Sequence, residues 1–100
     1  MTELDPDAIE RINATLGTAL GSDLAAHLQR DVVMLVSPPL GLLDCAMAVA
    51  RDDAAAVSAW LATGALRRPD PTERDLYLAT PERQWRSVVV QPWVFIQSLD

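Results

Sequence analysis

The densest run of bulky apolar residues lies near the end of the chain, in the sequence VVVQPWVFIQ at residues 88–97. β-branched and aromatic residues favour strands, so this run predicts a long strand in the hydrophobic core. Pro92 lies in the middle of the run and cannot donate a hydrogen bond to a neighbouring strand. The strand is therefore expected to be an edge, to be bulged at Pro92, or to bend there from one pairing partner to another.

A second apolar run, Val32–Val36, is hydrophobic at every position. Such a run is typical of a strand that is buried on both faces, so we expect it to be a central strand. Ser37-Pro38-Pro39 follows and should end the strand, because neither proline can extend a ladder or allow its predecessor a helical conformation. Ala65–Arg68 predicts a further short strand just before Pro69.

Between Gly41 and Gly64, apolar residues recur at spacings of three and four, which indicates helix. Asp52 and Asp53 divide this range, so it predicts two helices that form an αα-hairpin. Asp52 is expected to be the N-cap of the second helix, and Asp53 to lie at its positive end. Gly64 suits the left-handed residue just past the C-terminus of that helix.

Three further helix starts carry capping signals. Asp5-Pro6-Asp7 combines an N-cap residue, a proline at the first helical position and an acid, and predicts a helix that weakens at Gly17. Ser22 is expected to cap a second helix ahead of the apolar strand. Asp70 with Glu73 three residues later forms a capping-box pattern, so a further helix should begin there.

These elements predict an α+β fold. The sheet is expected to contain about three strands, covered by the αα-hairpin and by additional short helices. No internal repeat, low-complexity tract or linker interrupts the chain, so residues 1–100 are expected to form a single domain. A small sheet has two edges, and an unpaired edge invites pairing with a partner, including a second copy across a two-fold axis.

Composition narrows the classes of function. The eight basic residues stand against fourteen acids, and the formal net charge of −6 disfavours nucleic-acid binding and association with anionic membranes. No apolar run approaches the ~20 residues that a membrane span needs, and no signal peptide pattern opens the chain, so a cytoplasmic location is expected. The lone Cys45 fits a reducing compartment and excludes an intrachain disulfide.

Several segments resemble a known family. They are the apolar strand at residues 32–36, the Asp52-Asp53 pair ahead of Val57-Ser58-Ala59-Trp60-Leu61, and the ending VVVQPWVFIQ. Their order resembles a family of small bacterial proteins known as domain of unknown function 2288, over residues 22 to 97. No established activity comes with that resemblance. The family pattern favours two acids in the first turn of the helix after Pro39, whereas here only Asp44 is acidic and Gly41 occupies the other place.

The candidate polar residues each have a structural alternative. Adjacent acids at a helix start, such as Asp52 and Asp53, can bind a divalent cation or do acid/base chemistry, but capping explains them equally well. Cys45 with His27 would be a candidate thiolate pair, yet Cys45 lies among apolar residues where a thiol simply packs. The sequence shows no metal-ligand spacing, and neither a metal nor a cofactor is expected.

Three tryptophans, Trp60, Trp85 and Trp93, occur in a chain with few aromatic residues. At least two are expected in the core, and one that is exposed would be a natural anchor for a partner, because tryptophan is enriched at interface hot spots. Gln97 is expected to satisfy a backbone group or a tryptophan indole, and contact with a ligand is the alternative.

The leading hypothesis is a non-enzymatic domain that acts through protein contacts, as a homodimer or as a subunit of a larger partner. Its supporting features are the apolar strand, the tryptophans and the absence of a reaction centre. The alternative is a small-molecule-binding or metal-assisted enzyme, with a pocket near Asp44, Asp52, Asp53 and Gln97. On either hypothesis, the residues expected to contact a ligand or partner are Trp60, Trp93, Gln97, Asp44, Asp52 and Asp53.

Overall fold

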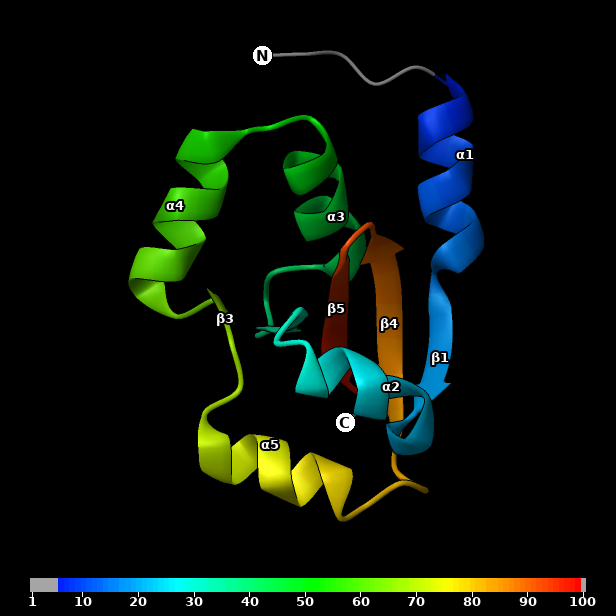
Figure 1. Ribbon diagram of the computed structural model, residues 1–100. Coiled ribbons are helices and arrows are strands. Elements are labelled where there is room, and N and C mark those ends of the chain that lie inside the picture. The colour runs from blue at the N-terminus through cyan, green and yellow to red at the C-terminus, as the bar shows by residue number, and fades with distance from the viewer. Residues whose placement is uncertain (1–5, 100) are drawn as a thin grey trace.

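A mixed β-sheet runs through the centre of the computed structural model, which describes residues 6–99 (Figure 1). Within this range the chain forms five helices and five strands. The helices are α1 (Pro6–Thr15), α2 (Gly21–Gln29), α3 (Leu42–Ala50), α4 (Ala54–Thr63) and α5 (Pro71–Leu78). The strands are β1 (Gly17–Leu20), β2 (Val33–Val36), β3 (Leu66–Arg67), β4 (Gln84–Val90) and β5 (Trp93–Ser98). The α+β class is confirmed, but the expected sheet of about three strands is wrong, because five strands pair.

The order of the strands across the sheet is β1-β4-β5-β2-β3. Strand β5 lies in the middle, antiparallel to β4 and parallel to β2. In this position Phe95 lies beside Val88 on one side and Met34 on the other. The prediction that the Val32–Val36 run forms a central strand is confirmed, since β2 lies between β5 and β3.

The C-terminal apolar run is a hairpin of two strands, and not one long strand. Strand β4 ends at Val90 and β5 begins at Trp93, and these two residues pair with each other. Gln91 and Pro92 form the connecting turn, and their peptide bond is cis. The three expectations for Pro92, an edge, a bulge or a bend within one strand, are therefore wrong. The proline lies in the turn, where no neighbouring strand needs its missing N–H.

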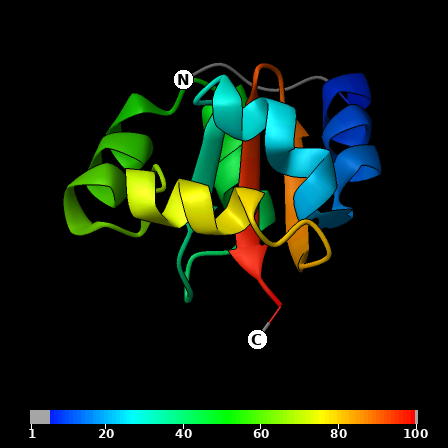
Figure 2. The ribbon, with the colours of Figure 1, turned by 60° about the horizontal axis from the view of Figure 1, so that its bottom comes forward.

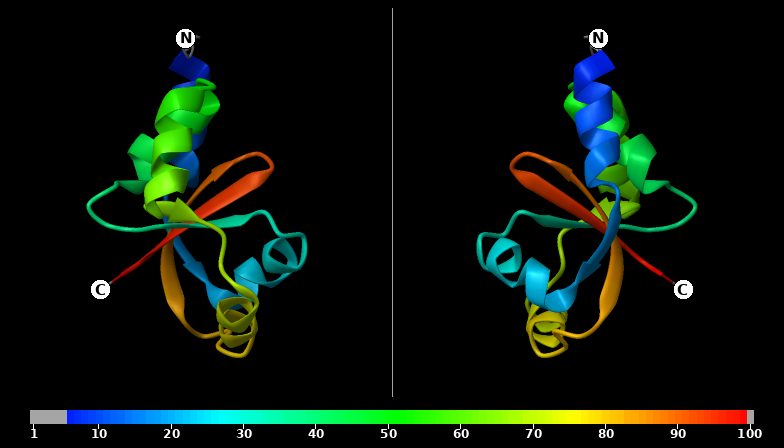
Figure 3. Two further views of the ribbon diagram at one scale, coloured as in Figure 1. Left: turned by 90° about the vertical axis from the view of Figure 1, so that its left-hand side faces the viewer. Right: turned by 90° about the vertical axis from the view of Figure 1, so that its right-hand side faces the viewer.

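Side chains alternate between the two faces of the sheet, and each face has its own hydrophobic cluster. Helices α1, α3 and α4 lie on one side of the sheet, and α2 and α5 on the other (Figures 2 and 3). The first cluster contains Ile12, Met34, Val36, Leu42, Cys45, Ala46, Leu66, Val88 and Phe95. The second contains Leu24, Leu28, Val33, Leu35, Tyr77, Trp85, Val94 and Ile96.

Helices α3 and α4 follow one another in the predicted range, but they do not cover the sheet as an αα-hairpin. Helix α3 buries four side chains, at Leu42, Cys45, Ala46 and Ala48. Helix α4 has no buried residue and lies toward the β3 end of the sheet (Figure 1). The first face is therefore covered mainly by α1 and α3, and helices cover the second face as well.

The start of α4 differs from the sequence-based expectation by one residue. Asp53, and not Asp52, is the N-cap, and its carboxylate accepts a hydrogen bond from the Ala56 N–H at 3.3 Å. Asp52 instead has a left-handed backbone with φ of 56°, in the connection after α3. Gly64 adopts the expected left-handed conformation at the end of α4, with φ of 81°.

Strand β1 was not expected from the sequence. This strand occupies Gly17–Leu20, where only a weakened helix end was expected, and it pairs with β4. Helix α2 begins directly after it, so Leu20 is its N-cap and Ser22 lies inside the helix. Asp23 accepts the Leu20 N–H at 3.1 Å. The prediction that Ser22 caps this helix is thus wrong. The predicted N-cap at Asp5 lies outside the described residues.

The central position of β5 predicts a large cost for truncating it. Phe95 is 1% exposed, so Phe95→Ala should lower the free energy of unfolding by about 3–5 kcal/mol, because a buried cavity replaces the ring. Urea denaturation followed by circular dichroism measures this loss. The matched control is Leu76→Ala on α5, where the side chain is 53% exposed and the change should stay within about 0.5 kcal/mol. Equal losses in both variants would contradict the burial of β5.

Candidate functional site

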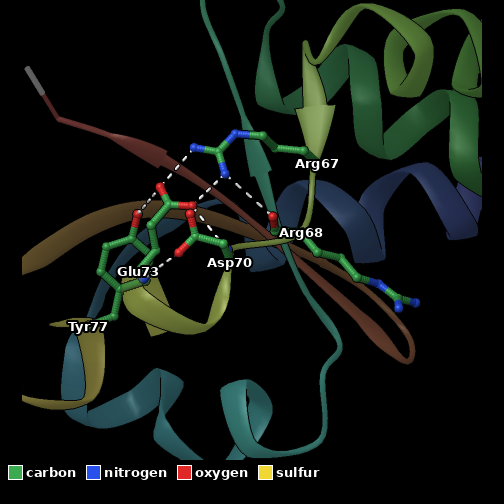
Figure 4. A network of polar contacts seen from close by, with 5 residues as sticks. All are labelled: Arg67, Arg68, Asp70, Glu73 and Tyr77. Atoms are coloured by element: carbon green, nitrogen blue, oxygen red, sulfur yellow. Dashed lines mark hydrogen bonds and ion pairs between the residues drawn. The ribbon is translucent and has the colours of Figure 1, made fainter. Parts of the chain in front are cut away.

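The strongest polar network in the structure joins the end of β3 to the start of α5 (Figure 4). Arg67 donates two hydrogen bonds to the Glu73 carboxylate, at 2.6 and 2.8 Å. Glu73 also accepts the Asp70 N–H at 3.0 Å, and Asp70 accepts the Glu73 N–H at 2.8 Å. The predicted capping box is therefore confirmed. The hydrogen bond from Arg67, followed by that from the Asp70 N–H, lowers the pKa of Glu73 to about 2.

The hydrogen bonds of this network hold chain segments together. The bidentate pair binds β3 to α5, and the Tyr77 hydroxyl adds a donor to Glu73 at 3.4 Å. The same carboxylate raises the pKa of Arg67 above its usual value, mainly through the side-chain hydrogen bond. We therefore assign this network a structural role, since Glu73 stays charged at neutral pH and cannot exchange protons there.

An apolar hollow of about 500 Å³ lies where α4 approaches the sheet, and we call it the α4 groove. Its size falls within the range of ligand sites, and most of its wall is hydrophobic. The lining residues are Met34, Val49, Val57, Leu61, Leu66, Arg67, Arg68, Trp93 and Phe95. At the rim, the Arg68 guanidinium lies 5.7 Å from the centroid of the Trp93 ring and forms an ion pair with Asp31 at 3.1 Å.

The groove exists because α4 does not pack closely on the sheet. Its sequence, AAAVSAWLAT, contains no charged residue, and none of its side chains is buried. Val57 and Trp60 pack against the first cluster while remaining partly exposed. The other side of the helix meets solvent, and even Leu61, which lines the groove, is 50% exposed. An apolar helix is normally buried in a core, so the exposure of α4 needs an explanation.

A second hollow, of about 550 Å³, lies at the start of α3, and we call it the polar pocket. It is lined by Leu16, Gly17, Thr18, Gly41, Leu42, Leu43, Asp44, Arg86, Gln97 and Leu99. Gln97 comes from β5 and is held in place by its amide nitrogen, which donates to the Leu40 carbonyl at 2.8 Å. This hydrogen bond confirms the expectation that Gln97 satisfies a backbone group.

The structure divides the six sequence-predicted site residues between separate places. Asp44 and Gln97 share the polar pocket, and Trp93 lines the α4 groove, with Trp60 on the helix above it. Asp52 and Asp53 lie past the opposite end of α3 and line neither hollow. The expected single pocket near Asp44, Asp52, Asp53 and Gln97 is therefore wrong, because a nine-residue helix, about 13 Å long, separates the two pairs.

The six predicted site residues do not include Leu61, Arg68 and Arg86, which line the two hollows. For Arg86 a signal was available, since alternation along β4 places it on the same face as the buried Val88. A charged residue on a core face points to a polar site. The third tryptophan, Trp85, is 3% exposed and lies in the second cluster, so it cannot serve as an exposed anchor.

Neither a metal centre nor a nucleophile pair is assembled in residues 6–99. No group of three or more His, Cys, Asp or Glu side chains lies together in this range. Cys45 belongs to the first cluster, whereas His27 is on α2 beyond the other face of the sheet, so the two cannot meet. The described helices are also too short, or too polar, to cross a bilayer.

Comparison with known proteins gives the family. Residues 7–98 match the family described as "Protein of unknown function (DUF2288)". The chain belongs to this family. The match confirms the resemblance seen in the sequence and extends it to α1, which lies before the segments that carried the resemblance.

A solved structure supports the fold of this DUF2288 chain. It is the NMR solution structure of PA1075 from Pseudomonas aeruginosa, which is 28% identical in sequence and has a TM-score of 0.79. The alignment covers 100% of this chain and 92% of that chain. No curated protein matches the chain. The comparisons therefore establish family and fold, and the two hollows carry the functional argument.

The Glu73 network predicts a pH-dependent stability of the DUF2288 fold. Because the folded pKa is about 2 and the ordinary value is 4.5, the stabilising contribution of Glu73 is complete above pH 4.5 and is lost as pH falls toward 2. Glu73→Gln should cost about 1–2 kcal/mol of unfolding free energy at neutral pH, since its side chain is only 25% exposed.

The measurement is urea denaturation of both proteins at neutral pH and near the folded pKa of Glu73. The difference between wild type and Glu73→Gln should shrink as the pH falls, because protonation removes the same interaction. Glu82→Gln, at an exposed residue in the turn before β4, is the matched control and should follow wild type at every pH. A difference that is independent of pH would rule out the ionised Glu73 as its source.

Cys45 of the DUF2288 chain should be unreactive while the fold is intact. Its side chain is 0% exposed, and burial raises the pKa of the thiol to about 11, so the reactive thiolate is scarce. A disulfide exchange reagent at about pH 8 should label the native protein only at the rate of unfolding, and should label it fully in guanidinium. Fast labelling without denaturant would show that the first cluster is open at Cys45.

Proposed function

We propose that this chain is a protein-binding domain that self-associates through α4 and the adjoining groove. The observation that carries the proposal is a helix of ten residues without a charge and without a buried side chain. Exposed apolar surface of this kind, next to an apolar hollow, marks interaction sites in proteins. The exposed residues of the helix are Ala54, Ala55, Ser58, Ala59, Leu61, Ala62 and Thr63.

Charge supports a second copy as the occupant. Copies of a chain with a net charge of −6 repel each other, and an uncharged helix is a surface where two of them can approach at little electrostatic cost. Asp52 and Asp53 precede the helix. An antiparallel pair of α4 helices across a two-fold axis places the two acidic starts at opposite ends, where they do not repel each other.

The shape of the helix also suits such a pair. Ala54, Ser58 and Leu61 recur at spacings of four and three, which places two small exposed side chains on the same side as Leu61 and allows close approach of two helices. Leu61 and the half-buried Trp93 lie at the mouth of the groove and offer the large apolar surface that anchors an interface.

The proposal predicts a dimer that depends on Leu61. Wild type should sediment as a dimer at about 100 μM, a concentration well above a micromolar dissociation constant. Leu61→Glu should be a monomer, because a dimer would bury an unpaired carboxylate from each copy. Analytical ultracentrifugation measures both, and circular dichroism confirms that the variants are folded.

The control for this experiment is Leu76→Glu. Leu76 is 53% exposed on α5, against 50% for Leu61, so the two variants introduce the same charge at equally exposed leucines. Leu76→Glu should remain a dimer. A wild-type protein that stays monomeric throughout the concentration series would overturn the proposal, as would dissociation by both variants equally.

A further inference from the structure

The polar pocket contains opposite charges that are not used elsewhere in the fold. Asp44 projects from the first turn of α3, and Arg86 from β4. Within residues 6–99, the side-chain ion pairs are Arg67 with Glu73 and Arg68 with Asp31. Asp44 and Arg86 thus face one hollow without pairing with each other or with another described residue. Both charges remain available to a ligand.

Gln97 adds a hydrogen-bond acceptor whose orientation is fixed. The side chain is 9% exposed, and its amide nitrogen donates to the Leu40 carbonyl at 2.8 Å. The Leu40 carbonyl can accept a hydrogen bond only from the amide nitrogen of Gln97. The amide oxygen of Gln97 therefore points away from the Leu40 carbonyl. That oxygen forms no hydrogen bond to a described residue, although the side chain lines the polar pocket.

The remaining wall is apolar and open. Leu16 and Leu99 are 43% and 47% exposed, and Leu42 and Leu43 complete the hydrophobic part. A Cβ at Gly17 would meet no atom within 4 Å, so nothing fills the space there. A Cβ at Gly41 would lie 3.1 Å from Oδ2 of Asp44, so the glycine leaves the carboxylate room at the pocket wall.

We propose that the polar pocket binds a small zwitterion, of the type of an α-amino acid with an apolar side chain. The ligand ammonium donates to the Asp44 carboxylate and the Gln97 oxygen, while its carboxylate accepts a bidentate pair of hydrogen bonds from Arg86. A simple anion would be repelled by Asp44, and a simple cation by Arg86. The leucines then cover the apolar side chain of the ligand. This site is separate from α4, so it does not rest on the proposed self-association.

The test uses L-leucine as the probe and the full 100-residue chain, with backbone and side-chain amide shifts followed by NMR. L-leucine should produce saturable shifts centred on the polar pocket, including the Gln97 side-chain NH2. The companions are 4-methylpentanoate, which lacks the ammonium, and 3-methylbutylamine, which lacks the carboxylate. Each should bind at least about tenfold more weakly, because one charge-assisted contact is lost.

Two variants assign the contacts, each with a matched control. Arg86→Gln and Asp44→Asn should each weaken L-leucine binding at least about tenfold, while Arg11→Gln and Asp75→Asn, at exposed residues outside the pocket, should leave it unchanged. The proposal is overturned by an absence of saturable shifts with L-leucine. It is equally overturned if 4-methylpentanoate or 3-methylbutylamine binds as tightly, or if either pocket variant keeps the wild-type affinity.

Discussion

Strand β5 pairs with a strand on each side and has buried apolar side chains on both of its faces. The rest of the structure depends on this double constraint. Its position between β4 and β2 commits every backbone group along its pairing region. Its side chains alternate between the two clusters, with Phe95 in one and Ile96 in the other. Helices must therefore cover both faces of the sheet, and α1 with α3 and α2 with α5 provide that cover.

Helix α4 is not needed for this cover, and its position explains the α4 groove. Because α1 and α3 already bury the first face, α4 remains beside β3 and leaves the groove open. The polar pocket has a different origin, since it forms where the start of α3 meets β1 and the ends of β4 and β5. Helix α3 and strand β5 contribute to both hollows, but no residue lines both of them.

Local signals in the sequence were sufficient for some elements. The capping box of Asp70 with Glu73 and the left-handed Gly64 at the end of α4 were both predicted correctly. Each depends only on groups within four residues along the chain. Strand β1 was missed because Gly17–Leu20 has no strand pattern of its own and is held by pairing with β4, which is distant in the sequence. The hairpin at Pro92 was misread for a related reason, since β4 and β5 are both strongly apolar and only their pairing distinguishes two strands from one. The site residues were predicted by chemical type, but which of them share a hollow depends on the fold.

The edge strands of the sheet are shorter than β4 and β5, which lie inside it. Its margins are β1, with four residues, and β3, with two, while the strongly apolar β4 and β5 lie inside. Short edge strands offer a neighbouring chain few free N–H and C=O groups. The strongly apolar β4 and β5 therefore lie away from the two edges at which a neighbouring chain could extend the sheet.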